Sequence, residues 1–120
     1  MGYFPGRRIG FGGNEAKTLM LDWAYNARNG KYRLKNSQFD YERELKNVKQ
    51  PVLAINFNDD GYAPVKATSY LLSKFSQPNP DKILISAKQL GAKKADHFSW
   101  IKQPNAVASN VSNWINSLQN

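Results

Sequence analysis

Two short apolar runs constrain the fold of this chain more than any other feature. They span residues 52–57 (VLAINF) and 83–87 (ILISA), and neither alternates like a strand with one solvated face. Such runs are typical of parallel strands covered by helices on both faces. Because residues 65–75 between them carry apolar side chains at helical spacing, this half of the chain predicts a right-handed strand–helix–strand crossover.

A last amphipathic helix is predicted over residues 106–118. The resulting sheet has only two strands, and a parallel sheet of that size is not stable alone in water. We therefore expect neighbouring strands from elsewhere. They come either from a second copy of the chain, giving a homo-oligomer, or from a missing N-terminal half of a longer protein.

The first fifty residues have a different character. Residues 1–13 contain five glycines among large apolar side chains, which predicts an irregular segment with positive φ at several positions. From Asn14, the expected N-cap, to Asn29, apolar residues recur every three or four positions, and Gly30 follows as the expected C-cap. This spacing predicts an amphipathic helix. A shorter helix is expected before the break at Pro51.

The composition excludes several classes of protein. Lys and Arg number 17 against 9 Asp and Glu, but the excess is divided between the two halves, which argues against a surface that reads a specific nucleic acid. The chain has no cysteine, which excludes disulfides and is compatible with our expected location, the cytoplasm. A single histidine excludes multi-histidine metal sites. We find neither a signal peptide nor a run long enough to span a membrane.

Asp60 and His97 are the candidate catalytic residues. Asp60 follows the first apolar run in PVLAINFNDDGYAP, and His97 follows the second in KKADHFSWI. Functional groups of α/β sheets gather at the carboxyl ends of the strands, where both residues are expected to lie. A carboxylate that holds one imidazole nitrogen leaves the other free to take a proton from a nucleophile. Each residue also has a plainer interpretation, a structural histidine and an ordinary Asp-Asp-Gly turn.

These stretches, together with MGYFPGRRIGFG and DWAYNAR, resemble the C-terminal part of α/β-hydrolases. The resemblance is closest to a predicted bacterial group related to serine aminopeptidases and lysophospholipases, and it covers nearly the whole chain. It implies an α/β fold with a cap-like segment over residues 1–50 and two parallel βα units over residues 51–120. It also implies that Asp60, four residues before Pro64, is the triad acid and that His97 is the general base. Asp59 is then a structural or solvent-facing neighbour.

The chain departs from the family pattern at two points. Asp96 stands where the family has glycine, and we expect it either to favour the charged imidazole or to face water. The family's serine lies upstream of the acid in a G-x-S-x-G turn, and none of the nine serines here lies in such a turn. The chain is therefore expected to be inactive alone. The resemblance implies no metal or organic cofactor.

The function implied by the resemblance is hydrolysis of a small-molecule ester, thioester or amide, with this chain supplying two members of the triad. The alternative is a non-catalytic basic module that assembles by strand pairing or binds polyanions. Several aromatic residues of the first fifty are expected either to line an acyl or aryl pocket or to form the core of the cap: Tyr3, Phe4, Phe11, Trp23 and Tyr25.

Overall fold

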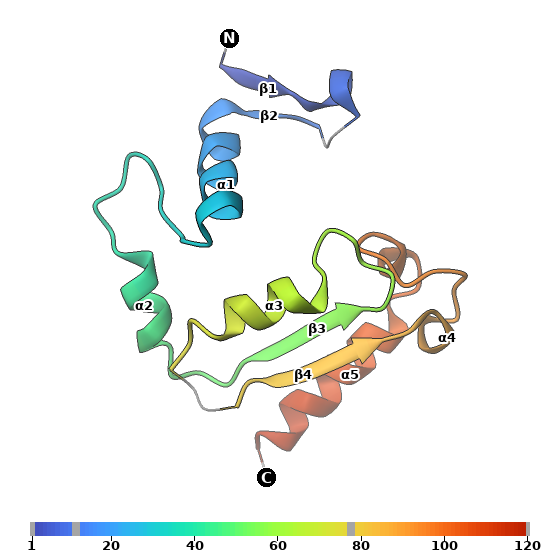
Figure 1. The fold of residues 1–120 in the computed structure, drawn as a ribbon. Coiled ribbons are helices and arrows are strands. Elements are labelled where there is room, and N and C mark those ends of the chain that lie inside the picture. The colour runs from blue at the N-terminus through green and yellow to red at the C-terminus, as the bar shows by residue number, and fades with distance from the viewer. Residues whose placement is uncertain (1, 11–12, 77–78, 120) are drawn as a thin grey trace. The chain divides into compact units, whose positions relative to one another are not determined.

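The computed structural model of the chain describes residues 2–10, 13–76 and 79–119. It is a mixed α/β structure that divides into two compact units, residues 1–47 and 48–120. Each unit contains one small two-stranded sheet and its own helices (Figure 1). None of the described helices is long and apolar enough to cross a membrane.

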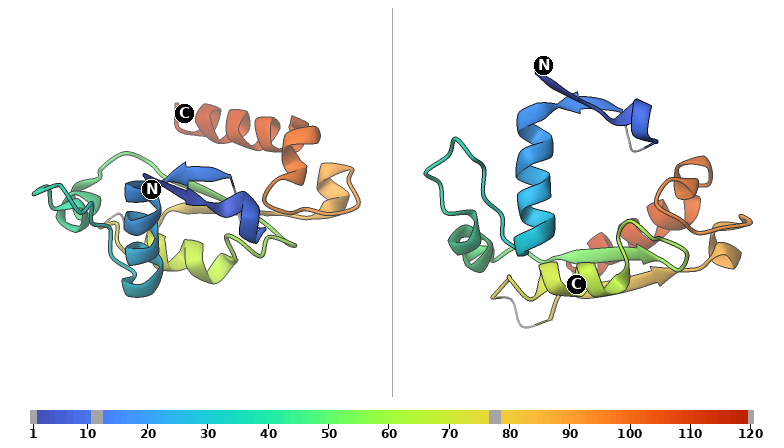
Figure 2. Two further views of the ribbon diagram at one scale, coloured as in Figure 1. Left: turned by 90° about the horizontal axis from the view of Figure 1, so that it is seen from above. Right: turned by 45° about the horizontal axis from the view of Figure 1, so that its top comes forward.

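The second unit is built on the predicted strand–helix–strand crossover. Its strands β3 (Leu53–Phe57) and β4 (Asp81–Ile85) pair in parallel, from Leu53 opposite Asp81 to Phe57 opposite Ile85. Helix α3 (Val65–Leu72) connects them, and the chain continues through α4 (Ala87–Leu90), the short 3₁₀ helix η2 (Ser99–Lys102) and α5 (Asn105–Ser117). Helices α3 and α5 lie on opposite faces of the sheet (Figure 2). The parallel pairing and the closing helix are confirmed.

The two faces of this sheet are covered unequally. Alternate residues of both strands pack toward the first turn of α5, and the core there is formed by Ile85, Leu90 and Ala95. Ile85 and Ala95 are fully buried. On the α3 face, the Asn56 amide donates to Thr68 Oγ1 at 2.8 Å, while Leu84 remains 51% exposed. The expectation that both faces of both strands are covered is therefore wrong for β4.

Strand β4 ends two residues earlier than the apolar run predicted, because the next residue starts a helix. Ser86 and Gln89 form a capping box: Gln89 N–H donates to Ser86 Oγ at 3.4 Å, and Ser86 N–H donates to Gln89 Oε1 at 2.9 Å. The Ser86 N–H therefore donates within the capping box and not to a neighbouring strand. Ala87, expected in the strand, is instead the first residue of α4.

The first unit begins with a hairpin, which the sequence did not predict. Strands β1 (Tyr3–Pro5) and β2 (Asn14–Ala16) pair antiparallel on either side of the 3₁₀ helix η1 (Gly6–Ile9). Asn14 pairs with Pro5 and is not an N-cap; the N-cap is Ala16, so helix α1 (Lys17–Asn29) starts two residues later than expected. Gly10, with φ of 70°, is the one glycine with positive φ among the described residues of 1–13.

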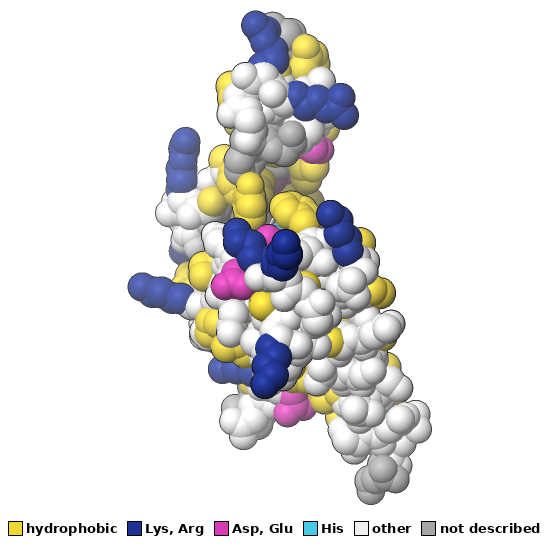
Figure 3. All heavy atoms as spheres, turned by 90° about the vertical axis from the view of Figure 1, so that its right-hand side faces the viewer, with side chains coloured by type: hydrophobic (Ala, Val, Ile, Leu, Met, Phe, Trp, Pro, Cys, Tyr) yellow, Lys and Arg dark blue, Asp and Glu magenta, His cyan; other side chains and the backbone are white. Residues whose placement is uncertain are grey.

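The remaining helices of the first unit follow the prediction. Gly30 ends α1 in the left-handed region with φ of 62°, and its N–H donates to Asn26 O at 2.7 Å. Helix α2 (Tyr41–Asn47) is the short helix expected before Pro51. In Figure 3, Lys and Arg side chains are visible on each unit, with Asp and Glu side chains among them.

Candidate functional site

Asp60 lies in the loop that leaves the carboxyl end of β3, and His97 lies in the loop that follows α4, the short helix directly after β4. Asp60 follows β3 by three residues, in a turn closed by the Asp60 N–H and Phe57 O at 3.2 Å. The ladder of the sheet continues one residue beyond β3, because Asn58 N–H donates to Ile85 O at 3.1 Å. Asp59 N–H donates to Ala95 O at 2.9 Å and joins this loop to the one that carries His97, so that residues 37 positions apart in the sequence come into contact.

The two side chains form a direct hydrogen bond. His97 Nδ1 lies 2.9 Å from Asp60 Oδ2. The Asp60 side chain is 3% exposed and the His97 side chain 43% exposed. The carboxylate is thus enclosed by the protein, and the imidazole extends from it toward solvent. The structure brings together both residues that the sequence singled out.

Asp60 also forms the turn that the plainer interpretation predicted. Its Oδ1 accepts hydrogen bonds from Tyr62 N–H at 2.8 Å and from Ala63 N–H at 2.9 Å. One carboxylate oxygen therefore holds the loop while the other holds the histidine. The turn and the Asp60–His97 pair, called the dyad below, are therefore not alternatives, because the turn fixes the direction in which Asp60 Oδ2 points.

The environment of Asp60 favours its ionised form. Burial, the largest single influence, raises its pKa, but the hydrogen bonds from Ala63, His97 and Tyr62 together outweigh burial and lower the pKa below its ordinary value. An ionised carboxylate can only accept hydrogen bonds, so the proton of this contact belongs to His97 Nδ1. In the neutral imidazole, Nε2 is then the unprotonated nitrogen, and no described residue forms a hydrogen bond with it.

Residues 91–98, which carry His97 and are called the histidine loop below, are held by their own hydrogen bonds, several of them to Asp96. Asp96 Oδ1 accepts from Phe98 N–H at 3.1 Å and from Ser99 N–H at 2.8 Å. These two bonds, that of Ser99 first, lower the pKa of Asp96. The Asp96 carboxylate therefore caps the loop, a role that the sequence did not predict. Trp100 Nε1 donates to His97 O at 3.1 Å and closes the same loop.

Two hollows of different chemistry meet at His97. One, of about 400 Å³, has polar and charged walls that include Tyr62, Lys94 and Asp96. The other, of about 340 Å³, is mainly apolar and is lined by Ile55, Phe57, Ala63, Trp100 and Ile101 together with Asp60. His97 and Phe98 line both hollows. The imidazole therefore stands between a polar and an apolar space.

Two aromatic rings flank the imidazole, and the sequence analysis did not identify either of them. The ring centroid of Tyr62 lies 5.6 Å from that of His97, and the centroid of Phe98 lies 4.9 Å from it. Both residues are more than half exposed. Their only signal in the sequence is adjacency to the two motifs, in DDGYAP and DHFSW. The two rings therefore border the imidazole with apolar surface.

A nucleophile for this pair is absent from the described residues. Ser99 is the nearest serine in the sequence, and its hydroxyl donates to Lys94 O at 2.9 Å. No described serine forms a hydrogen bond with the His97 ring. The described residues also contain no group of three or more His, Cys, Asp or Glu side chains that could hold a metal ion. In the described part of the chain, the site therefore consists of the Asp60–His97 pair with no serine hydrogen-bonded to its imidazole.

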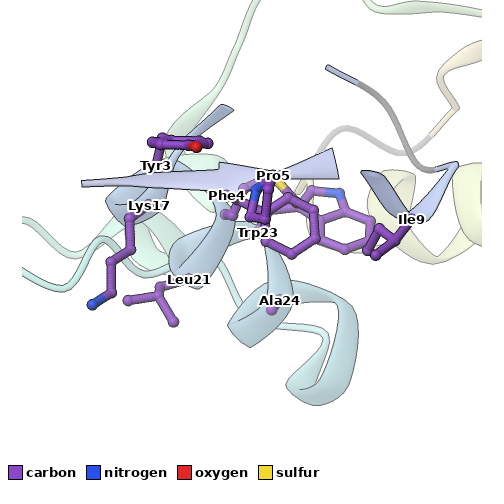
Figure 4. Close-up of a pocket in the computed structure, with 9 residues that line it drawn as sticks. Tyr3, Phe4, Pro5, Ile9, Lys17, Leu21, Trp23 and Ala24 are labelled. Atoms are coloured by element: carbon purple, nitrogen blue, oxygen red, sulfur yellow. The ribbon is translucent and has the colours of Figure 1, made fainter. Parts of the chain in front are cut away.

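The first unit contains a larger, apolar groove of about 790 Å³ (Figure 4). Tyr3, Phe4 and Trp23 line it, as one of the two expectations for the aromatic residues required. Tyr25 does not line it; the Arg33 guanidinium lies 4.1 Å from the Tyr25 ring centroid. Phe11 is outside the described residues. The remaining lining residues are Pro5, Ile9, Lys17, Met20, Leu21 and Ala24.

Comparisons of the chain with protein-family models, with curated proteins and with solved structures found no match.

Proposed function

We propose that this chain supplies the acid and the base of a serine-hydrolase triad acting on small-molecule esters, thioesters or amides. The observation that carries the proposal is the 2.9 Å contact between His97 Nδ1 and Asp60 Oδ2 at the carboxyl ends of two parallel strands. A buried, ionised carboxylate beside a partly exposed imidazole is what such a pair requires. The likeness of the motifs to α/β-hydrolases agrees with this assignment.

In this mechanism Asp60 stays ionised and holds His97 in one tautomer and one orientation. Nε2 takes the proton of a serine hydroxyl as the oxygen attacks the substrate carbonyl, and then returns a proton to the leaving alcohol, thiol or amine. A base in this position contributes about 10²- to 10⁴-fold to the rate. The serine and the oxyanion hole belong to a segment outside this sequence.

The proposal extends to location and assembly. The absence of cysteine from the sequence fits the reducing cytoplasm. The strands β3 and β4 pair with each other and with no further described strand, so each has one edge open to pairing. A nucleophile-bearing part of the same protein, or a second copy of the chain, is the expected neighbour of those edges.

The test is to read the coding sequence that precedes Met1 and to express the extended protein. An in-frame strand followed by G-x-S-x-G, with labelling of that serine by a fluorophosphonate, supports the proposal. His97→Ala should then lower kcat/KM for p-nitrophenyl esters by at least about 10³-fold. The 120-residue chain alone should hydrolyse these esters no faster than free imidazole.

An upstream sequence without a nucleophile turn would contradict the hydrolase assignment. It would favour the alternative, a non-catalytic basic module that pairs through its strands or binds polyanions. In that case His97→Ala should leave binding to a polyanion such as heparin unchanged, since one half-exposed imidazole adds little to a net charge of +8.

A further inference from the structure

A reciprocal pair of hydrogen bonds joins the loops that carry Asp60 and His97. Asp59 N–H donates to Ala95 O at 2.9 Å, and Ala95 N–H donates to Asp59 Oδ2 at 2.9 Å. Asp59 directly precedes Asp60, and Ala95 lies two residues before His97. Any displacement at this pair therefore changes the distance between the carboxylate and the imidazole.

The other bonds of these loops act within each loop. Asp60 Oδ1 binds the N–H groups of Tyr62 and Ala63, and Asp96 Oδ1 binds those of Phe98 and Ser99. These bonds fix the shape of each loop but not the position of one loop relative to the other. In the described chain, two kinds of hydrogen bond connect the turn that contains Asp60 with the histidine loop. One is the Asp60–His97 bond, and the others are the two bonds between Asp59 and Ala95.

The side chain of Asp59 accepts the hydrogen bond of a buried backbone N–H, that of Ala95. Ala95 is fully buried within the core of the second unit, so water does not reach its N–H. Asp59 Oδ2 is the acceptor that the structure provides for that donor. An unpaired buried N–H is costly, so loss of the carboxylate favours movement of the histidine loop toward another acceptor or toward water.

We propose that Asp59 is a positioning residue, which holds the histidine loop at the distance that the Asp60–His97 hydrogen bond requires. The inference deepens the proposed function and rests on it for its catalytic meaning. The geometry that it predicts is nevertheless a property of this chain, so it is testable without a nucleophile or a substrate.

The experiment measures the tautomer of His97 from its imidazole nitrogen chemical shifts. His97 is the single histidine in the sequence, so the signal has one source. In alkaline buffer, where an ordinary imidazole is neutral, the Nδ1–H form should dominate in the wild-type chain. Asp59→Ala should lower the ratio of Nδ1–H to Nε2–H forms about fivefold, because movement of the histidine loop takes His97 Nδ1–H out of line with its acceptor, Asp60 Oδ2.

Two further variants of Asp59 separate positioning from simple loss of stability. Asp59→Asn keeps an oxygen that can accept from Ala95 N–H, and it should restore the tautomer ratio to within about twofold of wild type. Asp59→Glu keeps the charge but moves the acceptor by one methylene, and it should lower the ratio as Asp59→Ala does. Urea unfolding of each variant reports stability, and the asparagine and glutamate variants supply the comparison if Asp59→Ala fails to fold.

The outcomes distinguish this inference from the proposed function. Asp60→Asn removes the dyad's carboxylate, and it should shift the tautomer more than any Asp59 variant. If Asp60→Asn shifts the tautomer while the Asp59 variants lower only stability, Asp59 is structural and the inference is overturned. If Asp60→Asn also leaves the tautomer unchanged, the dyad does not form in solution, and the proposed function falls together with the inference.

Discussion

The two units of this chain both expose large apolar side chains, but they differ in the apolar side chains that they bury. In the second unit the buried ones form a small core, in which Ile85 and Ala95 are fully buried and Leu72 and Leu90 nearly so. In the described part of the first unit, no hydrophobic side chain is buried, and Leu19 and Trp23 of α1 are more than half exposed. An amphipathic helix and a hairpin are therefore formed there without the burial that normally stabilises them.

This difference shows where a functional site can be held in place. The Asp60–His97 pair belongs to the unit with a core, and its loops are attached to that core through Ala95. The apolar groove belongs to the unit without one, where the lining residues Ile9 and Trp23 keep more than half of their surface exposed. Exposed apolar surface on this scale is typical of a face that is covered in an assembly.

Truncation of a core residue should have the largest effect on stability. Ile85→Ala removes a fully buried side chain from β4 and should lower the free energy of unfolding by about 2–5 kcal/mol, through lost burial and a cavity. Leu19→Ala, the matched change in α1 at a side chain 58% exposed, should cost less than about 0.5 kcal/mol. Urea unfolding compares them. Equal losses would show that the first unit has a core of its own.

The mass of the chain in solution should be about twice that of one copy, 13.6 kDa, or more. Strands β3 and β4 each have an edge that no described strand pairs with, and the first unit exposes much of its apolar surface. Light scattering over a range of concentrations measures this. A species of 13.6 kDa that unfolds cooperatively would show that neither surface needs a partner.

The sequence predicted the second unit better than the first, for physical reasons. Strands β3 and β4 follow from a local hydrophobic pattern, and the Asp60–His97 contact follows from the connectivity of a parallel crossover, which brings the carboxyl ends of both strands to one edge of the sheet. The β1–β2 hairpin depends on pairing between two three-residue strands, one of which ends at Pro5, and neither carries a periodic pattern. That pairing placed Asn14 in a strand.

The contacts that support the site were less predictable than the site itself. The sequence places Asp59 in an Asp-Asp-Gly turn, and its partner Ala95 has no side chain that would single it out. Their pairing depends on how two loops leave the sheet. The role of Asp96 likewise follows from the loop's backbone, which turns Phe98 and Ser99 N–H groups toward its carboxylate.

Asp60 should make the second unit sensitive to acid. Its pKa is lower in the folded chain than in the unfolded one, so its stabilisation is complete above about pH 4–5 and is lost as the pH falls through the folded pKa. Asp60→Asn should cost about 1–2 kcal/mol near neutral pH and flatten the decline of stability below about pH 4. Urea unfolding at several pH values measures both effects. A parallel decline in wild type and variant would assign acid sensitivity to other carboxylates.

The smallest effects compare a real helix cap with an expected one. Ser86→Ala removes the capping box of α4, next to the buried Leu90, and should cost about 1 kcal/mol. Asn14→Ala changes a residue that the sequence assigned as the N-cap of α1, but Asn14 lies in β2 and caps nothing, so its cost should stay within about 0.5 kcal/mol. Urea unfolding followed by circular dichroism resolves the difference. If Asn14→Ala were the more costly change, α1 would begin at Asn14 in solution, and the hairpin pairing of Tyr3–Pro5 with Asn14–Ala16 would have to give way to a longer helix.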